Sequence, residues 1–158
     1  SRVMLVLFSL ILAAALTAVD QLLKQLVVLQ LKPGRVVTVI PNLLTLFYSE
    51  NRGAAFGMLA NHRWVFIVVT VVLMAACLWA LLTRYRRNAF ACLALALILS
   101  GGLANMIDRV LQGYVVDYIF ISFFPAVFNF ADCCVVIGAI MALIGLFVAE
   151  RRAHKKAA

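Results

Sequence analysis

Acidic residues are the side chains of this sequence whose type and placement could do chemistry. Only six occur in 158 residues, namely Asp20, Glu50, Asp108, Asp117, Asp132 and Glu150. Glu150 lies in a basic tail and needs no function. The other five lie at or beyond one set of ends of long apolar segments, so they could converge on one membrane boundary. Ionisable groups at membrane depth are costly and usually face a protein interior or a water-filled cavity.

Asp117 and Asp132 are the pair best suited to catalysis. Asp117 lies in an otherwise apolar loop, and Asp132 ends the stretch FNFAD just before the last apolar segment. An Asp just before an apolar helix is typical of an N-cap, which would account for Asp132. That structural role does not account for Asp117. Two close carboxyl groups cannot both ionise cheaply, so such a pair should titrate as a coupled unit. Because a helix dipole favours an anion, we predict that Asp132 is the ionised partner and that Asp117 keeps the proton.

Two further polar clusters interrupt apolar segments. Asp20 and Lys24 are four residues apart on a predicted helix, so they can pair, and we favour an ion pair over a direct catalytic role. Asn105 and Asp108 point the same way on another helix, with Arg109 about 100° further round. Arg109 could hold a carboxylate, a substrate carbonyl or a phosphate. Alternatively, this cluster simply faces lipid headgroups.

The composition indicates that lipid is the solvent for most of the chain. Hydrophobic residues make up 66% and charged residues 13%, with a mean hydropathy of +1.10. Residues 1–158 are predicted to form one membrane domain with helices spanning about 3–31, 65–82, 89–107 and 133–149. The N-terminal run after Arg2 resembles a signal peptide, but it is too long and lacks a small-residue cleavage site. We therefore interpret it as a retained membrane helix.

Basic residues set the predicted topology. They cluster at one set of helix ends, which the positive-inside rule places in the cytoplasm together with both termini. Segments 32–63 and 111–131 are then extracytoplasmic. Their β-branched and aromatic runs, including 36–40 and 43–48, predict short strands. The expected fold is a mainly α membrane protein of four transmembrane helices with a small extracytoplasmic β-rich platform and loop.

Other function classes find little support. The net charge of +8 does not indicate nucleic-acid binding, because the basic residues sit at the ends of apolar runs. No metal or organic cofactor is expected, since the two histidines are far apart and lie outside the spans. The four cysteines lie in apolar stretches and are read as buried: Cys77, Cys92, Cys133 and Cys134.

Several stretches, taken in order, resemble the motifs of lipoprotein signal peptidase, also called signal peptidase II. They are NRGAAFG at 51–57, GGLANMIDR at 101–109, GYVVDY at 113–118 and FNFAD at 128–132, and the Asp20–Lys24 spacing also matches. The sequence departs from the family at Ala104, where glycine is usual, and at Tyr118, where phenylalanine is common. Ala104 could crowd a close helix contact, and Tyr118 adds a hydroxyl beside the proposed pair.

The resemblance implies a bacterial inner-membrane aspartyl protease whose catalytic dyad is Asp117 and Asp132, near the outer face. This family removes the signal peptide from prolipoproteins, cutting N-terminal to a diacylglyceryl-modified cysteine. Membrane lipids and globomycin-type inhibitors are the other implied partners. The implied polar or substrate-binding shell consists of Asp20, Lys24, Asn51, Gly53, Asn105, Asp108, Arg109 and Asn129.

Two alternatives to the protease remain open from the residues alone. A small proton-coupled carrier would use the same carboxylates as a relay, and it predicts acids strung across the membrane. A structural four-helix subunit would use them only for packing. For the protease, segment 32–63, with its small residues at 53–55, is predicted to close over a substrate arriving sideways from lipid.

Overall fold

Four long helices and a three-stranded sheet make up the computed structural model, which describes residues 2–32, 34–53 and 58–157. The helices are α1 (Arg2–Leu31), α2 (Arg63–Leu82), α3 (Ala89–Gln112) and α4 (Phe130–Ala157). The strands are β1 (Val36–Ile40), β2 (Leu44–Asn51) and β3 (Val115–Ile121). Each of these four helices is long and apolar enough to cross a bilayer, which confirms the predicted fold class.

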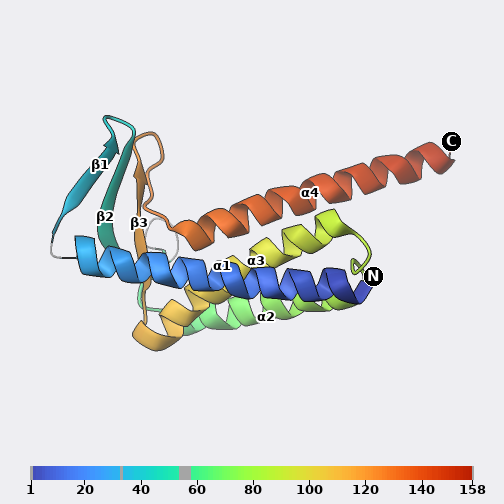
Figure 1. The fold of residues 1–158 in the computed structure, drawn as a ribbon, viewed down its shortest axis with the longest axis horizontal. Helices are drawn as coiled ribbons and strands as arrows, with labels where there is room; N and C mark the ends of the chain where they lie inside the picture. The colour runs from blue at the N-terminus through green and yellow to red at the C-terminus, as the bar shows by residue number, and fades with distance from the viewer. Residues whose placement is uncertain (1, 33, 54–57, 158) are drawn as a thin grey trace.

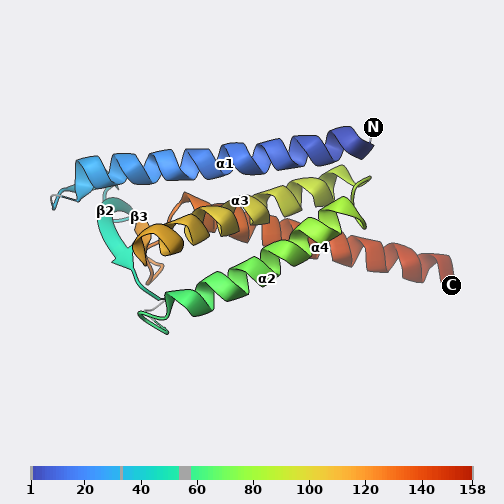
Figure 2. The ribbon, with the colours of Figure 1, turned by 90° about the horizontal axis from the view of Figure 1, so that it is seen from below.

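Helix α3 is the centre of the bundle. It packs against α1, α2 and α4, and it lies between α1 and α2 in Figure 2. Both chain ends and the α2–α3 turn lie at one end of the bundle, while the sheet lies at the other (Figure 1). Many large apolar side chains of α2 are exposed, as expected of a helix that faces lipid.

Small residues let α3 and α4 approach closely. A Cβ added to Gly101 would collide with the backbone oxygen of Ala131, and one added to Gly138 would lie 2.7 Å from the oxygen of Ala94. Close helix contact through small residues is typical of membrane bundles, where backbone approach maximises packing. The contact at Gly101 lies beside the first turn of α4, so it fixes how that turn sits against α3.

The sheet has the order β1-β2-β3 and is antiparallel throughout. Ser49 pairs with Asp117 and Asn51 with Val115, after an irregularity between Leu46 and Ser49. Asn51 is therefore a diagonal neighbour of Asp117 on the same face of the sheet. This register brings a side chain of segment 32–63 onto a residue of segment 111–131.

Two helices extend beyond the predicted membrane spans. Helix α3 continues beyond residue 107 to Gln112, where Gly113 ends it with a left-handed φ of 83°. Helix α4 begins at Phe130 rather than 133 and continues beyond 149 to Ala157. Hydropathy marks the length that lies in lipid, whereas a helix continues until its backbone hydrogen bonding is interrupted.

The buried core divides into two clusters along the bundle. Leu81 of α2 packs with Cys92 and Leu99 of the first half of α3 and with residues of α1. At the sheet end, Val27 and Leu31 of α1 pack against Val116 and Tyr118 of β3. The second cluster holds the sheet against the bundle, at the end where the polar residues gather. The four cysteines are free thiols, two of them buried and two half-buried.

Candidate active site

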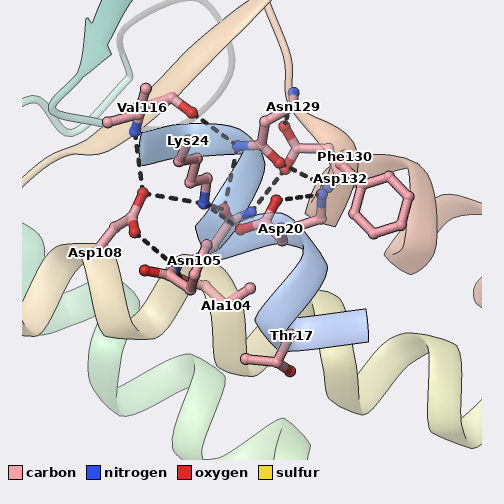
Figure 3. A network of polar contacts seen from close by, with 12 residues as sticks. Thr17, Asp20, Lys24, Ala104, Asn105, Asp108, Val116, Asn129, Phe130 and Asp132 are labelled. Carbon is pink, nitrogen blue, oxygen red and sulfur yellow. Dashed lines mark hydrogen bonds and ion pairs between the residues drawn. The ribbon is translucent and has the colours of Figure 1, made fainter. Parts of the chain in front are cut away.

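Lys24 is the centre of a buried ion cluster between α1 and α3. Its Nζ lies 2.8 Å from Asp20 Oδ2 and 2.9 Å from Asp108 Oδ2, as Figure 3 shows. Its side chain is only 3% exposed. The predicted pair between Asp20 and Lys24 is therefore present, but it is part of a three-residue cluster, which we call the Lys24 cluster. The sequence did not predict that Gln21 would also bind it, through a 2.9 Å hydrogen bond to Asp108 Oδ1.

Lys24 also connects this cluster to Asn105. The Nζ donates to Asn105 Oδ1 at 2.9 Å, and Asn105 Nδ2 donates to Asp132 Oδ1 at 2.8 Å. Because Lys24 can only donate, its contact fixes which end of the Asn105 amide faces Asp132. Lys24 therefore orients a donor toward the candidate catalytic carboxylate without touching that carboxylate.

Asp132 is not the N-cap of α4, contrary to the sequence expectation. Asn129 is the cap, because its Oδ1 accepts from the backbone N–H of Asp132 at 2.9 Å. In return, Asp132 Oδ2 accepts from the backbone N–H of Asn129 at 3.0 Å. This reciprocal pair is a capping box, with the acid at the third helical position. The carboxylate of Asp132 is thereby held at the positive end of the helix dipole.

The other free N–H groups of the first turn of α4 also have partners. Ala131 donates to Asp20 Oδ1 at 2.9 Å, and Phe130 donates to the hydroxyl of Tyr118 at 3.3 Å. A buried N–H without a partner would be costly. Asp20 therefore has two roles: it neutralises Lys24 and holds the helix that carries Asp132.

Asn129 is the residue that joins the two candidate catalytic carboxylates. Its Nδ2 donates to Asp117 Oδ1 at 2.7 Å, while its backbone N–H donates to Asp132. The same Nδ2 lies 3.1 Å from Asn105 Oδ1. Asn129 is completely buried, so these contacts do not compete with bulk water. One side chain thus fixes the relative positions of Asp117 and Asp132.

Asp117 receives a second amide donor from β2. Asn51 Nδ2 donates to Asp117 Oδ2 at 3.0 Å, so each oxygen of Asp117 has one amide partner. Burial, together with the nearby charge of Asp132, raises the pKa of Asp117 to about 7, although the bonds from Asn51 and Asn129 act in the opposite direction. A carboxyl group with this pKa holds a proton near neutral pH about half of the time.

Asp117 and Asp132 both face a cavity of about 530 Å³. Asn51 and Arg109 are the other polar residues of the cavity wall. Most of the remaining wall is apolar, and its larger side chains are Phe123, Phe124, Phe128, Val136 and Ile137. Such a cavity fits an apolar chain segment whose backbone passes the two carboxyl groups.

Arg109 lines this cavity, a position that is compatible with the substrate-binding role considered from the sequence. Its guanidinium lies 4.8 Å from the ring centre of Phe66, and its Nη2 donates to the oxygen of Gly53 at 3.3 Å. Gly53 in turn donates its N–H to Asn51 Oδ1 at 3.0 Å. The adjoining residues 54–57, which belong to the predicted closing segment, lie outside the described residues.

Glu50 does not join the other acids. It forms a 2.8 Å ion pair with Arg52 and accepts from Tyr48 at 2.9 Å, in contact with solvent. The hydrogen bond from Tyr48, and next the ion pair with Arg52, lower the pKa of Glu50.

Ala104, which stands where the family usually has glycine, is fully buried, and its backbone oxygen accepts from Gln21 at 3.1 Å. The predicted site residues lie at the sheet end of the bundle, where Glu50 is also found on β2.

Taken together, four membrane-length helices and paired carboxyl groups facing one cavity define a multi-pass membrane protein with a buried acid–base site. A model of the family described as signal peptidase (SPase) II matches residues 12–148. The chain belongs to the signal peptidase II family, and it is therefore a membrane protease. The family resemblance seen in the sequence motifs is thus confirmed.

Individual relatives agree with this assignment. A lipoprotein signal peptidase of Streptococcus thermophilus (strain CNRZ 1066) is 38% identical over 141 residues, covering 89% of this chain and 92% of that protein. One from Caldanaerobacter subterraneus subsp. tengcongensis is 44% identical over 133 residues, covering 84% and 91%. A solved structure of a bacterial membrane enzyme aligns with a TM-score of 0.83 at 32% identity, covering 89% of this chain and 87% of that one.

Proposed function

We propose that this protein is an aspartic endopeptidase that removes the signal peptide of prolipoproteins, cutting N-terminal to a diacylglyceryl-modified cysteine. Membership of the signal peptidase II family supports signal-peptide cleavage. The observation that carries the aspartic assignment is that Asp117 and Asp132 face one cavity and share Asn129 as a hydrogen-bonding partner. Asp117 and Asp132 are the catalytic residues of this proposal.

The two carboxyl groups have different environments, and this supports different roles. Asp132 accepts two N–H bonds at a helix N-terminus, an arrangement that stabilises its anion. Asp117, with a pKa raised to about 7, keeps a proton into the neutral range. Asp132 is therefore the base that takes a proton from the attacking water, and Asp117 is the acid that donates a hydrogen bond to the scissile carbonyl.

Proton transfers then complete the reaction. Water adds to the carbonyl carbon while its proton moves to Asp132, and Asp117 protonates the carbonyl oxygen. Collapse of the tetrahedral intermediate breaks the C–N bond, and the proton on Asp132 passes to the leaving amine. Asp117 recovers its proton from the hydroxyl of the intermediate. Each carboxyl group ends the cycle as it began.

The Lys24 cluster positions this pair rather than reacting. Lys24 orients Asn105 toward Asp132, and Asp20 holds the N–H of Ala131 in the same helical turn. Arg109, on the cavity wall, is placed to bind a substrate carbonyl or a lipid phosphate. These residues supply the fixed geometry that hydrolysis by two carboxyl groups requires.

Substrate reaches the cavity sideways from the lipid. Moving acyl chains into water would cost about 0.8 kcal/mol per CH₂, whereas the phenylalanines and aliphatic side chains of the cavity wall offer an apolar route. Globomycin-type cyclic peptides would compete for the same cavity. Closure by segment 32–63 belongs to this proposal, and crosslinks that tether the segment without reducing turnover would contradict it.

The active site lies near the outer face of the membrane in this proposal, and both termini are cytoplasmic. The basic residues at the opposite end of the bundle support this orientation: Arg2, Arg84, Arg86, Arg87, Arg151, Arg152 and Lys155. The described acids of the site gather at the sheet end of the bundle, while apolar residues pack along the first half of α3. This distribution favours the protease over a proton-coupled carrier.

The proposal is tested with a diacylglyceryl-modified prolipoprotein and the purified protein in detergent. Asp117→Asn and Asp132→Asn should each lower kcat about 10²–10⁴-fold, because each removes one proton-transfer group. Glu50→Gln is the matched control, since it neutralises an exposed acid of the same sheet. The aspartic mechanism is wrong if either aspartate variant, still folded, keeps wild-type turnover. Cleavage of the unlipidated precursor at the wild-type rate would contradict the lipid requirement.

A further inference from the structure

Tyr118 follows Asp117 on β3 and points to the opposite face of the strand. Its side chain is 6% exposed and packs with Val27 and Leu31 of α1. The catalytic scheme does not use this residue, and the sequence marks it only as a departure from the phenylalanine common in the family. Its hydroxyl therefore needs a separate explanation.

Tyr118 contacts the chain on both sides of Asn129. Its backbone N–H donates to the oxygen of Phe128 at 3.0 Å, and its hydroxyl oxygen accepts from the N–H of Phe130 at 3.3 Å. The residue between them, Asn129, is the one that bonds to both Asp117 and Asp132. Tyr118 thus contacts the segment that joins the two carboxyl groups on both sides of Asn129, next to the backbone bridge between Ile119 and Phe128.

The hydroxyl also completes the capping of α4. The second and third N–H groups of the first turn bond to Asp20 and Asn129, so without Tyr118 the first N–H would be the one left without a protein partner. Capping of this first position by a side chain from another element is a tertiary contact, and it links the strand that carries Asp117 to the turn that carries Asp132.

We infer that Tyr118 is a positioning residue, whose hydroxyl fixes the separation of Asp117 and Asp132 by anchoring the first turn of α4 to β3. This inference rests on the proposed function. Burial raises the pKa of Tyr118 to about 12, so the hydroxyl stays neutral around neutral pH and its hydrogen bond with Phe130 does not change with pH there. A phenylalanine at position 118 would keep the ring packing and lose only the hydrogen bond with the N–H of Phe130.

Tyr118→Phe tests the inference, with Tyr48→Phe as the matched control. Tyr48 is on the same sheet, and its hydroxyl also makes one hydrogen bond, to Glu50, outside the cavity. In Tyr118→Phe, kcat should fall about three- to tenfold with KM within twofold of wild type. Tyr48→Phe should leave both constants unchanged. Amide hydrogen exchange at Phe130 should become faster only in Tyr118→Phe.

The outcomes separate this inference from the proposed function. Unchanged kcat and unchanged exchange at Phe130 in folded Tyr118→Phe would overturn the inference, while loss of cleavage in Asp117→Asn would leave the proposed function intact. If the wild type itself fails to cleave, the proposed function is wrong, and the positioning role for catalysis is wrong with it.

If Tyr118→Phe does not fold, 3-fluorotyrosine at position 118 keeps the shape of the side chain and makes its hydroxyl oxygen a weaker hydrogen-bond acceptor. It should then lower kcat in the same direction, and an unchanged kcat would overturn the inference.

Discussion

The two pairs of aspartates at the sheet end of the bundle differ in the residue that lies between them. Asp20 and Asp108 share Lys24, whose ammonium group lies within 2.9 Å of both. Asp117 and Asp132 share Asn129, which offers amide donors and no charge. Among the described residues, no basic side chain forms an ion pair with Asp117 or Asp132. Asp117 and Asp132 line the cavity described above, whereas Asp20 and Asp108 are not part of its wall.

This difference explains how one residue type performs two tasks a few ångströms apart. A lysine between two acids attracts both and compensates one of their two charges, which makes a rigid structural centre. An asparagine between two acids holds them in place but contributes no compensating charge of its own, so their mutual repulsion favours a proton on one of them. Under the proposed function, the bridging side chain therefore distinguishes the structural pair, which shares Lys24, from the catalytic pair, which shares Asn129.

Removing the charge from the first pair should have the largest effect on stability. Lys24→Met leaves Asp20 and Asp108 buried together without a cation, so the free energy of unfolding should fall by about 3–5 kcal/mol. Unfolding in mixed micelles measures this. Glu50→Gln, which breaks an exposed ion pair, is the control and should change it by less than about 1 kcal/mol.

The same variant can be rescued if the interpretation is right. Adding Asp20→Asn and Asp108→Asn to Lys24→Met removes the unbalanced charges, and it should recover much of the lost stability. A Lys24→Met protein as stable as the wild type would mean that the ion cluster is not the structural centre described above.

A change at the α3–α4 contact should disturb the second pair more than the first. In Gly101→Ala, the new methyl group meets the backbone oxygen of Ala131, next to Asp132, so α4 must shift. We expect a loss of about 1–3 kcal/mol in stability and a reduced kcat in the folded fraction. Gly102→Ala is the matched control, because its nearest new neighbour is the flexible side chain of Met74 at 3.4 Å. Equal kcat in the two variants would contradict this coupling.

The pH dependence should show a smaller effect that belongs to the second pair alone. Since the pKa of Asp117 is raised to about 7, kcat/KM should be halved near pH 7 and fall about tenfold per unit above it, as the acid loses its proton. The folded state binds this proton more tightly than the unfolded chain. Stability should therefore be greatest below the unfolded pKa of about 4 and fall as pH rises to about 7.

Asp117→Asn should remove that part of the stability profile, which unfolding midpoints at several pH values can measure. A wild-type profile that is flat between pH 4 and 7, or a variant profile identical to it, would show that Asp117 keeps an ordinary pKa. The same midpoints measured for Glu50→Gln provide the reference for an acid at the surface.

The sequence predicts those parts of the fold that depend on local patterns. Apolar length predicts the four spans, and the spacing of Asp20 and Lys24 predicts their pairing because residues four apart share a helix face. The addition of Asp108 to that pair depends on how α1 packs against α3. No local pattern encodes that packing, nor the register that brings Asn51 to Asp117.

The error at Asp132 is different, because the sequence did contain the signal. Asn129 precedes Asp132 by three residues, which is the spacing of a capping box at the start of an apolar helix. The last apolar run begins after Asp132, so attention to hydropathy alone put the helix start too late. The family motifs supplied Asn129 as part of the polar shell, but its bond to both carboxyl groups required the structure.

The capping of α4 has a consequence for biosynthesis. Among the four described helices, α1 carries Asp20 and is synthesised before α4, which carries Asp132, so the N–H of Ala131 reaches Asp20 only after α4 has entered the membrane. A nascent chain holding α1 to α3 already contains Lys24 and Asp108 but has neither Asn129 nor Asp132. If Asp117 and Asp132 are the catalytic pair as proposed, cleavage therefore requires the insertion of α4.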